Sequence, residues 1–405
     1  MAKVLYLLYD GLTDPLPQSQ VLPYLIGLTK YGYEFTIISF DKPDLYQKNK
    51  NLINDICKAN NIQWISLPYT KKPPILSTIY DLYKLFFFIK SYFKKNPFDM
   101  IHCRSYLVAI VGNAISKKFN VKMLFDIRGF WADEKVDSKS WDIKKPIFKK
   151  VYDFFKKKEK ILFKESDAIV CLTSASKNDI LKNHGEYVNE SKIQVIPCCV
   201  DTSLFVKQND EIQKTKKELG INTTDFVLCY LGSVGTWYEL GHMFQFFNLL
   251  SKKIDNAKFL FVSNSPKDII EEEAIKQGTN INNIVVLNSP RKDVPKYLSI
   301  CDLSVFFYKN VYSAKGCSPT KQGELMSMGI PLVCNSGIGD TSEIIKNYDA
   351  GFLVNEYSEQ EMNRIIDAFM LKTFDKTRIR NGAIEYYNLN VGIERYKNIY
   401  DKLIM

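Results

Sequence analysis

The chain predicts an α/β protein made of two doubly wound, parallel-sheet domains, and two observations carry this prediction. Short runs of β-branched and aromatic residues alternate with amphipathic stretches along the whole chain, which is typical of parallel sheets covered by helices. The chain has 405 residues, more than one hydrophobic core usually organises. We therefore expect two domains of about 200 residues each.

The strand-like runs fall into two groups on either side of a polar interval. In the first half they are KVLYLLY, EFTIISF, QWISLPY, DMIHCRS, KMLFDI, AIVCLT and IQVIPC. In the second half they are FVLCYLGS, AKFLFVSN, NIVVLN, LSVFFYK, PLVCNS and AGFLVN. We expect Rossmann-like domains at 1–203 and 204–383 that face each other across a cleft, and a helix over 384–405 that packs back across the first domain. Ligands of such sheets bind beyond the carboxyl ends of the strands, so the loops after these runs are the candidate sites.

Composition describes an ordinary folded protein with 46% hydrophobic and 25% charged residues. The N-terminus, MAKVLYLLYDG, reads as a strand and not as a secretory signal, and no apolar run approaches the roughly 20 residues of a membrane span. The nine cysteines are scattered, mostly in apolar runs, which predicts buried thiols in a reducing compartment. The three histidines lie far apart, without zinc-site spacing. We expect a cytoplasmic protein with no bound metal and no cofactor.

The most informative stretch is GCSPTKQGELMSMGIPLVCNSGIGD, in which a polar turn opens a short helix before a buried strand. Ser318 is expected to cap this helix and Pro319 to begin it. The N–H groups of the first turn and the helix dipole attract phosphate, and Thr320 and Lys321 add a hydroxyl and a charge. Glu324, about one turn further, is placed to accept hydrogen bonds from a ribose. In the competing interpretation the segment only starts a helix, and Glu324 is a solvated side chain.

A second glycine-containing turn, LGSVGTWY, directly follows the first strand of the same domain. Gly232 and Gly235 allow the backbone to approach an anion closely, and Ser233 and Thr236 supply hydroxyls. The turn is neither a GxGxxG motif nor a P-loop, so it is a weak signal alone. Together the two turns predict one nucleotide site.

These motifs resemble glycosyltransferase family 4, in the bacterial polysaccharide-biosynthesis subgroup whose donor motif reads SPTK followed by GE. The match here is Ser318 to Lys321 with Glu324, followed by Gly329-Ile-Pro331. The first half resembles the same subgroup at YDGLTDPLPQSQVLPYLIGL, DMIHCRSY, FDIRGFWADE, and at the pairing of IVCLT with IQVIPCCVD. The resemblance implies the GT-B fold and retaining transfer of a sugar from a nucleotide-diphosphate donor.

The resemblance also implies roles for individual residues. Glu324 binds the donor ribose, residues 318–321 bind the diphosphate or sugar, and the loop from Ser233 to Thr236 binds the phosphates. Arg291, together with Pro290, lies near the base. Gly11 gives the first loop the freedom to pass close to the donor.

This chain departs from the family pattern at three positions. Gly316 stands where the first of two acids is usual, so the acid that addresses the donor sugar is missing. Ser233 stands where a basic residue is often found, and Lys321 is a candidate to replace it. Pro17 replaces a glycine usual in the first loop.

In the first domain, FDIRGFWADE follows a strand and brings charged and aromatic residues to its carboxyl end. Many relatives have a histidine near this position, and its absence leaves Asp126 and Arg128, with Lys321, as the predicted catalytic residues. The competing interpretation pairs Arg128 with a nearby carboxylate as a structural contact. The predicted acceptor-binding residues are His102, Arg104, Trp131, Asp133 and Glu134. A core position for Trp131 and a structural role for His102 remain open.

The net charge of +10 gathers in two helical stretches. Residues 144–164 place lysines around apolar positions at 147, 148, 151, 154, 155, 161 and 162. Residues 84–95, KLFFFIKSYFKK, form a second such element. Basic amphipathic helices lie on anionic lipid, whereas the competing interpretation packs the stripe inward and leaves the lysines solvated. No stacking module for nucleic acid is recognisable.

We therefore expect a retaining, metal-independent glycosyltransferase of the hexosyltransferase type that uses a UDP- or GDP-sugar. No carboxylate pair at DxD spacing marks a donor metal site. The expected acceptor is a saccharide, lipid-linked in polysaccharide synthesis, and the expected location is the cytoplasm or the inner face of the membrane. Two alternatives stay open: an epimerase or hydrolase of sugar nucleotides on the same fold, and a membrane-bound scaffold with a degenerate nucleotide site.

Overall fold

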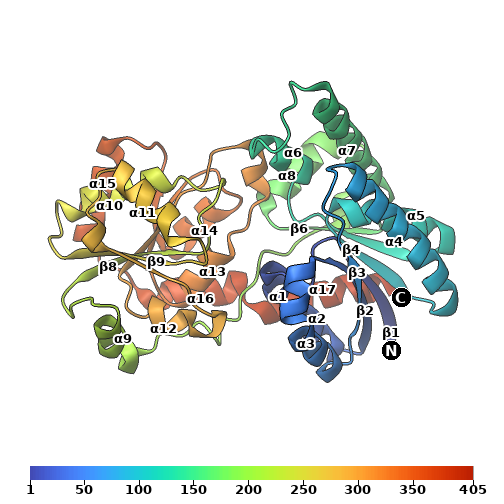
Figure 1. Cartoon of the computed structure of the whole chain (residues 1–405), viewed down its shortest axis with the longest axis horizontal. Coiled ribbons are helices and arrows are strands. Elements are labelled where there is room, and N and C mark those ends of the chain that lie inside the picture. Colours follow the sequence, from blue (N-terminus) through green and yellow to red (C-terminus); the bar gives the residue numbers. More distant parts are fainter. Residues whose placement is uncertain (405) are drawn as a thin grey trace. The chain divides into compact units, whose positions relative to one another are not determined.

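The computed structural model describes residues 1–404, which form two compact units (Figure 1). Unit 1 consists of residues 1–197 and of the chain from Leu389 on, and unit 2 of Cys198–Asn388. Residue 405, the last of the helix predicted for 384–405, lies outside the described residues. Each unit has its own parallel sheet and its own core.

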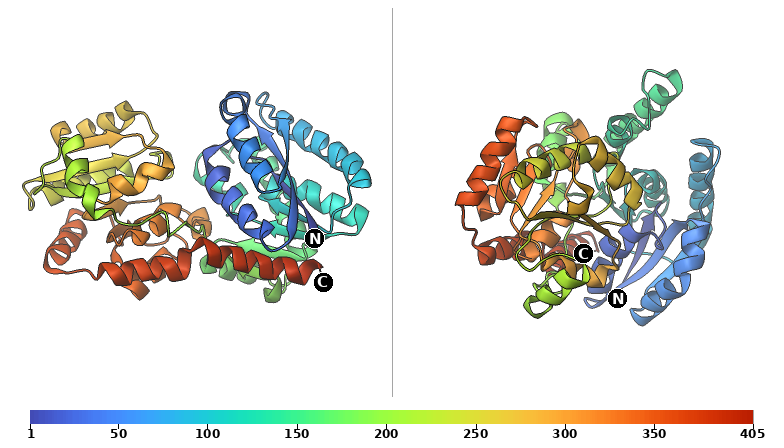
Figure 2. Two further views of the ribbon diagram at one scale, coloured as in Figure 1. Left: turned by 90° about the horizontal axis from the view of Figure 1, so that it is seen from below. Right: turned by 60° about the vertical axis from the view of Figure 1, so that its left-hand side comes forward.

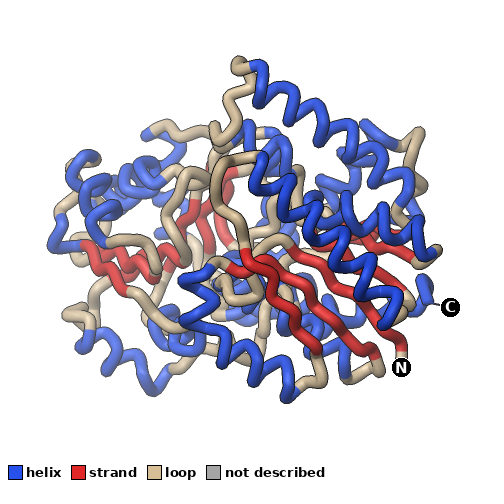
Figure 3. The backbone as a smooth tube through the Cα atoms, turned by 45° about the vertical axis from the view of Figure 1, so that its right-hand side comes forward, coloured by secondary structure: helices blue, strands red, loops and turns tan. Residues whose placement is uncertain are grey.

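The sheet of unit 1 has the order β3-β2-β1-β4-β5-β6-β7, and all neighbours are parallel. Its strands lie side by side, drawn in red near the N-terminus in Figure 3. The order reverses between β1 and β4, which is the topological switch point of a doubly wound sheet. All seven strands coincide with the predicted runs. They are β1 (Ala2–Leu8), β2 (Tyr33–Asp41), β3 (Gln63–Pro68), β4 (Met100–Arg104), β5 (Lys122–Asp126), β6 (Ala168–Cys171) and β7 (Ile193–Val195).

Helices connect the strands of unit 1 and cover the sheet, because right-handed crossovers in the two winding directions place helices on both faces. Helix α5 packs against both α4 and α7. The helices are α1 (Pro15–Gln20), α2 (Leu22–Thr29), α3 (Pro43–Ala59), α4 (Leu76–Lys95), α5 (Tyr106–Phe119), α6 (Trp131–Asp137), α7 (Pro146–Glu165), α8 (Ser174–His184) and α17 (Leu389–Ile404).

Unit 2 repeats the pattern with the sheet order β10-β9-β8-β11-β12-β13, again parallel, and the order reverses between β8 and β11. The strands match the six predicted runs. They are β8 (Phe226–Leu231), β9 (Ala257–Val262), β10 (Ile284–Leu287), β11 (Leu303–Phe306), β12 (Leu332–Asn335) and β13 (Gly351–Val354). The helices are α9 (Ile212–Glu218), α10 (Leu240–Ser251), α11 (Lys267–Lys276), α12 (Val294–Leu298), α13 (Thr320–Ser327), α14 (Thr341–Tyr348), α15 (Glu359–Leu371) and α16 (Lys376–Tyr387).

The unit boundaries differ from the predicted ones by a few residues at each crossing. Unit 1 ends at Pro197, where we predicted 203, and unit 2 ends at Asn388, where we predicted 383. The reason is a long-range contact: the backbone N–H of Val200 donates to the carbonyl of Tyr387 at 2.7 Å, and Val200 forms a parallel bridge with Asn388. This bridge therefore holds residues just after Pro197 and just before Leu389 within unit 2, where the chain enters and leaves that unit.

Helix α17 belongs to unit 1 and packs on α2, although it is the last element of the chain (Figure 2). The contact is close, because a Cβ atom placed on Gly27 of α2 would lie 2.2 Å from Cδ1 of Ile393. Ile393, Tyr396 and Tyr400 of α17 are buried. The amphipathic face of α17 therefore completes the core of unit 1.

Eight of the nine cysteines are buried, as their apolar surroundings predict. No helix among residues 1–404 combines the length and the apolar character that crossing a bilayer demands. Within the same residues, no three His, Cys, Asp or Glu side chains are grouped so as to hold a metal ion.

The docking of α17 predicts a stability effect that a surface helix would not show. Replacing Ile393 with alanine removes a buried side chain from the α2 contact, and we expect a loss of about 2–5 kcal/mol of unfolding free energy. Urea unfolding measures this loss. Glu394→Ala changes the exposed neighbour and should stay within about 0.5 kcal/mol of the parent; equal effects of the two variants would contradict the packing of α17 on unit 1.

Candidate functional site

Three tyrosines surround the side chain of Lys321 at the switch point of unit 2. Tyr230 is the penultimate residue of β8, and Tyr308 follows β11, so both come from the strands between which the order reverses. Nζ of Lys321 lies 4.0 Å from the ring centroids of Tyr230 and Tyr238 and 6.0 Å from that of Tyr308. We call these four residues the lysine cage.

A hydrogen-bonded chain fixes Lys321 in this cage. Its Nζ donates to the hydroxyl of Tyr230 at 2.9 Å, and that hydroxyl donates to the carbonyl of Ser233 at 2.8 Å. Lys321 is only 7% exposed, and burial lowers its pKa to about 7, although Cys317 and Glu324 partly oppose this shift. The cage therefore holds a cation, or the amine derived from it, directly beneath the loop after β8.

The loop that follows β8 lies against the cage. Gly232 has a φ of +108°, which favours glycine, and a Cβ atom placed there would lie 3.3 Å from Nζ of Lys321. Ser233, Gly235 and Thr236 are exposed. The structure thus brings together the two glycine-containing turns that the sequence singled out.

Glu324 lies on the same helix, one turn beyond Lys321, and pairs with Arg291. The Oε1 atom of Glu324 is 2.5 Å from NH1 of Arg291, whose guanidinium also lies 5.3 Å from the ring centroid of Phe205. Burial raises the pKa of Glu324, and the guanidinium only partly offsets that shift. The interpretation of Glu324 as a solvated side chain is wrong, since it is 5% exposed.

The start of α13 differs from the prediction. Thr320 is its first residue and Pro319 the capping residue, without a side-chain cap, so Ser318 is not the N-cap. Instead, Oγ of Ser318 accepts a hydrogen bond from the backbone N–H of Cys198 at 3.1 Å, which ties the turn to the start of unit 2. The hydroxyl of Ser318 is thus engaged outside the helix, and no side chain caps the start of α13.

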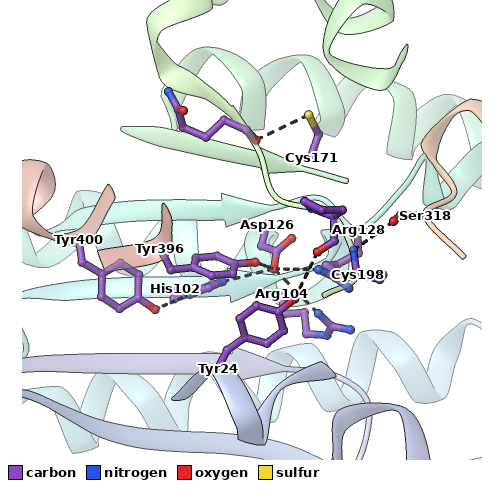
Figure 4. Close-up of polar contacts among 12 residues, drawn as sticks. Tyr24, His102, Arg104, Asp126, Arg128, Cys171, Cys198, Ser318, Tyr396 and Tyr400 are labelled. Atoms are coloured by element: carbon purple, nitrogen blue, oxygen red, sulfur yellow. Dashed lines mark hydrogen bonds and ion pairs between the residues drawn. The ribbon is translucent and has the colours of Figure 1, made fainter. Parts of the chain in front are cut away.

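In unit 1, a buried carboxylate gathers four cationic or aromatic partners at the carboxyl ends of β4 and β5 (Figure 4). Oδ2 of Asp126 lies 3.9 Å from NH1 of Arg104, 3.8 Å from NH1 of Arg128 and 3.6 Å from Nε2 of His102. It also accepts a hydrogen bond from the hydroxyl of Tyr396 at 2.9 Å. Burial alone would raise the pKa of Asp126, but Arg128, His102 and Arg104 together hold that pKa below its ordinary value.

The C-terminal helix supplies two of the groups in this network. Tyr396 and Tyr400 point from α17 toward the strands, and the hydroxyl of Tyr400 is 2.7 Å from Nδ1 of His102. Burial lowers the pKa of His102, which favours its neutral form. His102 is 2% exposed and enclosed between Tyr6, Tyr396 and Tyr400. Its structural interpretation fits these contacts, and its acceptor role stays a prediction.

Arg128 presents the least buried charge of this cluster. It adopts a φ of +57°, unusual for a residue with a side chain, and Gly129 follows with a φ of +137°. Such backbone strain costs about 1–3 kcal/mol and often accompanies functional sites. Asp126, in contrast, is 1% exposed. Any influence of Asp126 on a reacting sugar would pass through Arg104 and Arg128, which lie beside it.

The remaining predicted acceptor residues lie on α6 and contact α7. Asp133 accepts from Tyr152 at 2.8 Å and pairs with Lys156 at 3.0 Å. Trp131 packs against Trp141 and Phe155, with ring centroids 5.3 and 4.7 Å away, so it belongs to a small hydrophobic cluster. Burial raises the pKa of Glu134 to about 7.

The loop after β1 is fixed by a buried aspartate. Oδ1 of Asp41 accepts hydrogen bonds from the backbone N–H and the hydroxyl of Thr13, at 3.0 and 2.8 Å. A Cβ atom placed on Gly11 would lie 2.9 Å from the same oxygen, so glycine is required for this approach. Gly11 therefore lies at the carboxyl end of β1, beside the switch point of unit 1.

Sequence reasoning missed the three cage tyrosines, Phe205, and the tyrosines of α17. Tyr230 lies within the apolar run FVLCYLGS and looks like an ordinary core residue. Its position could have identified it: Tyr230 lies directly before the glycine loop, at the carboxyl end of a strand, where ligands of parallel sheets bind. Tyr396 and Tyr400 could not be assigned because they come from the far end of the chain.

The Asp126 cluster predicts a large effect of a nearly isosteric change. Asp126→Asn removes the negative charge and leaves two buried guanidinium groups without it, and we expect a loss of about 3–5 kcal/mol of unfolding free energy. Tyr396→Phe removes one hydrogen bond to the same carboxylate and should cost about 1.5–3 kcal/mol. Urea unfolding at pH 7 measures both. An unchanged midpoint in Asp126→Asn would show that the arginines do not depend on this carboxylate.

Two family models match successive parts of the chain. Residues 24–204 match the model described as Glycosyltransferase Family 4, and residues 211–386 match the model described as Glycosyl transferases group 1. The glycosyltransferase MJ1069 of Methanocaldococcus jannaschii is 24% identical over 321 residues, 76% of each chain. The UDP-Gal:alpha-D-GlcNAc-diphosphoundecaprenol alpha-1,3-galactosyltransferase of Escherichia coli is 24% identical over 342 residues, 82% of this chain and 80% of that protein.

Solved structures share the fold of the chain at low sequence identity. Sucrose-phosphate synthase from Thermosynechococcus elongatus has a TM-score of 0.77 at 14% identity, with 100% of this chain and 99% of that chain covered. Anabaena Alr3699/HepE in complex with UDP has a TM-score of 0.72 at 15% identity, with 99% of this chain and 100% of that chain covered. With the two family models and these folds in agreement, the chain is a glycosyltransferase whose two Rossmann-like units match those of GT-B enzymes.

Proposed function

We propose that the protein transfers a hexose from a nucleoside diphosphate sugar, with retention of configuration, to a saccharide acceptor. The observation that carries the donor assignment is the lysine cage and the Glu324–Arg291 pair on one helix turn at the switch point of unit 2. A basic group below a glycine loop fits a diphosphate, and a buried carboxylate one turn away fits the hydroxyls of a ribose. The related HepE structure holds UDP, which supports UDP as the nucleotide.

In this proposal, Lys321 and the N–H groups that open α13 stabilise the negative charge of the departing diphosphate. Preorganised donors of this kind lower the barrier most where water is excluded, and Lys321 is buried. Glu324 orients the nucleoside, and Arg291 shares its charge. The acceptor hydroxyl attacks from the face that the diphosphate leaves.

We further propose that unit 1 binds the acceptor through Arg128 and Arg104, which Asp126 positions. The acceptor we favour is a lipid-linked saccharide of polysaccharide synthesis, because the related E. coli enzyme is named for a diphosphoundecaprenol-linked acceptor. Such an acceptor remains anchored in the bilayer, so the enzyme must work at the membrane surface.

Two helices of unit 1 offer a surface for that membrane. Helix α4 exposes apolar and aromatic residues at helical spacing, and α7 exposes three more at intervals of seven residues. These residues are Leu76, Ile79, Tyr80, Tyr83, Phe87, Ile147, Phe154 and Ile161, each 39–65% exposed. Lysines accompany them: Nζ of Lys90 lies 5.8 Å from the ring of Phe87, and that of Lys158 lies 5.5 Å from the ring of Phe154.

The structure corrects the predicted stripes of both helices. The apolar positions of α7 face two sides, because Phe155 and Leu162 are buried while Phe154 and Ile161 point outward. The predicted element of α4 began at Lys84. Four of the five exposed apolar or aromatic residues of α4 lie before it, and only Phe87 lies within it. An outward row with flanking lysines supports peripheral binding to anionic lipid.

The donor assignment predicts which ligands stabilise the protein. In a thermal-shift panel of UDP-, GDP-, ADP- and CDP-sugars, we expect one nucleotide to raise the melting temperature, with UDP favoured; at 100 Kd the gain is about 2.7 kcal/mol. Glu324→Gln should weaken binding about 10- to 100-fold, as expected for a hydrogen bond to a charged group.

Glu343→Gln is the matched control, because Glu343 is an exposed carboxylate on α14 of the same unit.

Transfer must also depend on an acceptor. Nucleoside diphosphate released at the same rate without acceptor would favour a hydrolase, and full transfer activity in Glu324→Ala would discredit the donor site.

The membrane assignment predicts salt-dependent flotation. The protein should float with liposomes that contain phosphatidylglycerol, and the double variant Tyr83→Asp with Phe154→Asp should lose most of this binding. Ile275→Asp is the control, since Ile275 of α11 in unit 2 is also 65% exposed. Absence of flotation at both low and high salt would sink the membrane proposal.

A further inference from the structure

The lysine cage is built almost entirely from neutral groups. Within residues 1–404, the hydroxyl of Tyr230 is the hydrogen-bond acceptor of the Lys321 amine, and the ring centroids of Tyr238 and Tyr308 lie 4.0 and 6.0 Å from its Nζ atom. The tyrosine hydroxyls keep their protons at neutral pH, because burial raises their pKa values. Tyr238 and Tyr308 are further joined by their hydroxyls at 3.2 Å.

The charged and titratable groups around Lys321 come from few elements. On its own helix, Glu324 faces it, but the carboxylate is engaged by Arg291. From the turn before α13 comes the thiol of Cys317. Among the described residues, β8, the loop after it and the end of β11 contribute the three tyrosines to the groups around Lys321. No carboxylate among residues 1–404 forms an ion pair with Lys321.

We propose that above pH 7 Lys321 is mainly an uncharged amine in the empty site, and that it takes up a proton when the diphosphate of the nucleotide binds. The inference rests on the proposed donor site and adds a protonation step to it. The proton comes from the solvent and forms the ammonium, while no covalent bond to carbon, phosphorus or oxygen changes. The tyrosines remain protonated throughout.

The physical reason is that the ligand brings the charge that the cage lacks. Without it, burial disfavours the ammonium, and the pKa of Lys321 lies at about 7. A diphosphate within about 4–6 Å favours the charged form and restores an ordinary lysine. The faces of the aromatic rings then stabilise the cation.

The consequence is a coupling between pH and donor affinity. Above pH 7, each further pH unit lowers the protonated fraction of the empty site, so the affinity should fall by up to about tenfold per unit. A permanently charged lysine at an exposed site would give no such dependence in this range. The empty site also needs no counterion, which keeps it free for the nucleotide.

Isothermal titration calorimetry tests the proposal on the wild-type chain. The nucleoside diphosphate that binds, chosen from UDP, GDP, ADP and CDP, is titrated at pH 8.0 in HEPES, Tricine and Tris, which differ in their heats of ionisation and supply no phosphate. At this pH the ligand is fully ionised, so proton uptake reports on the protein. We expect about one proton taken up per nucleotide, and about a tenfold weaker Kd at pH 8.5 than at pH 7.5.

Lys321→Met has a similar length and an apolar end that suits the aromatic cage. It should bind more weakly, take up no proton, and show an affinity that does not change with pH; circular dichroism confirms its fold. Lys292→Met removes an exposed lysine of the same unit and should take up the proton as the wild type does.

Each result decides between the two proposals. Wild-type binding with an uptake below about 0.2 proton, or the same uptake in Lys321→Met, overturns the inference and leaves the donor site intact. Failure of all four nucleotides to bind overturns the proposed function, and the inference with it.

Discussion

Each unit buries a charged side chain at or beside the point where its strand order reverses: Lys321 lies by the ends of β8 and β11, and Asp126 ends β5, the neighbour of β4. At such a switch point two adjacent loops diverge, and this opening is what a ligand can use. A charged side chain buried there loses its contact with water. This desolvation costs several kcal/mol of folding free energy unless partner groups stabilise the charge. The two units solve this problem with opposite chemistry.

In unit 1 the buried group is a carboxylate, and the compensation is ionic. Asp126 is held by Arg104 and Arg128 and by a phenol from α17, so it remains charged. In unit 2 the buried group is Lys321, and the compensation is aromatic and neutral. An ion pair keeps its charge in the empty state, whereas a neutral cage lets the lysine change its charge with its ligand. This difference fits a permanently charged cluster for the proposed acceptor in unit 1 and a ligand-dependent charge for the proposed donor in unit 2.

Much of this architecture could be predicted because it is encoded locally. The strands follow from β-branched and aromatic runs, and the two glycine turns mark the proposed nucleotide site without any tertiary information. The unit boundaries could not be placed to the residue, because the bridge between Val200 and Asn388 joins segments far apart in sequence. The same holds for Tyr396 and Tyr400, whose partners on β4 and β5 precede them by most of the chain. On α7, neighbouring positions such as Phe154 and Phe155 both fit an amphipathic pattern, and only packing shows which one turns outward.

The departures from the family pattern also have a structural reading. The position that often carries a basic residue after the first strand of the donor domain is Ser233, and its carbonyl accepts the hydroxyl proton of Tyr230, which in turn accepts from Lys321. A single chain of hydrogen bonds thus connects the altered loop position with the lysine that we assign to the diphosphate. Gly232, with its positive φ and no side chain, leaves the space that Nζ occupies. In our proposal, the cation that meets the diphosphate comes from helix α13 and not from the loop after β8. A lysine that reaches the end of the sheet from a helix is buried there, and the hydroxyl of Tyr230 and the rings of Tyr230 and Tyr238 take the place of water around its Nζ atom.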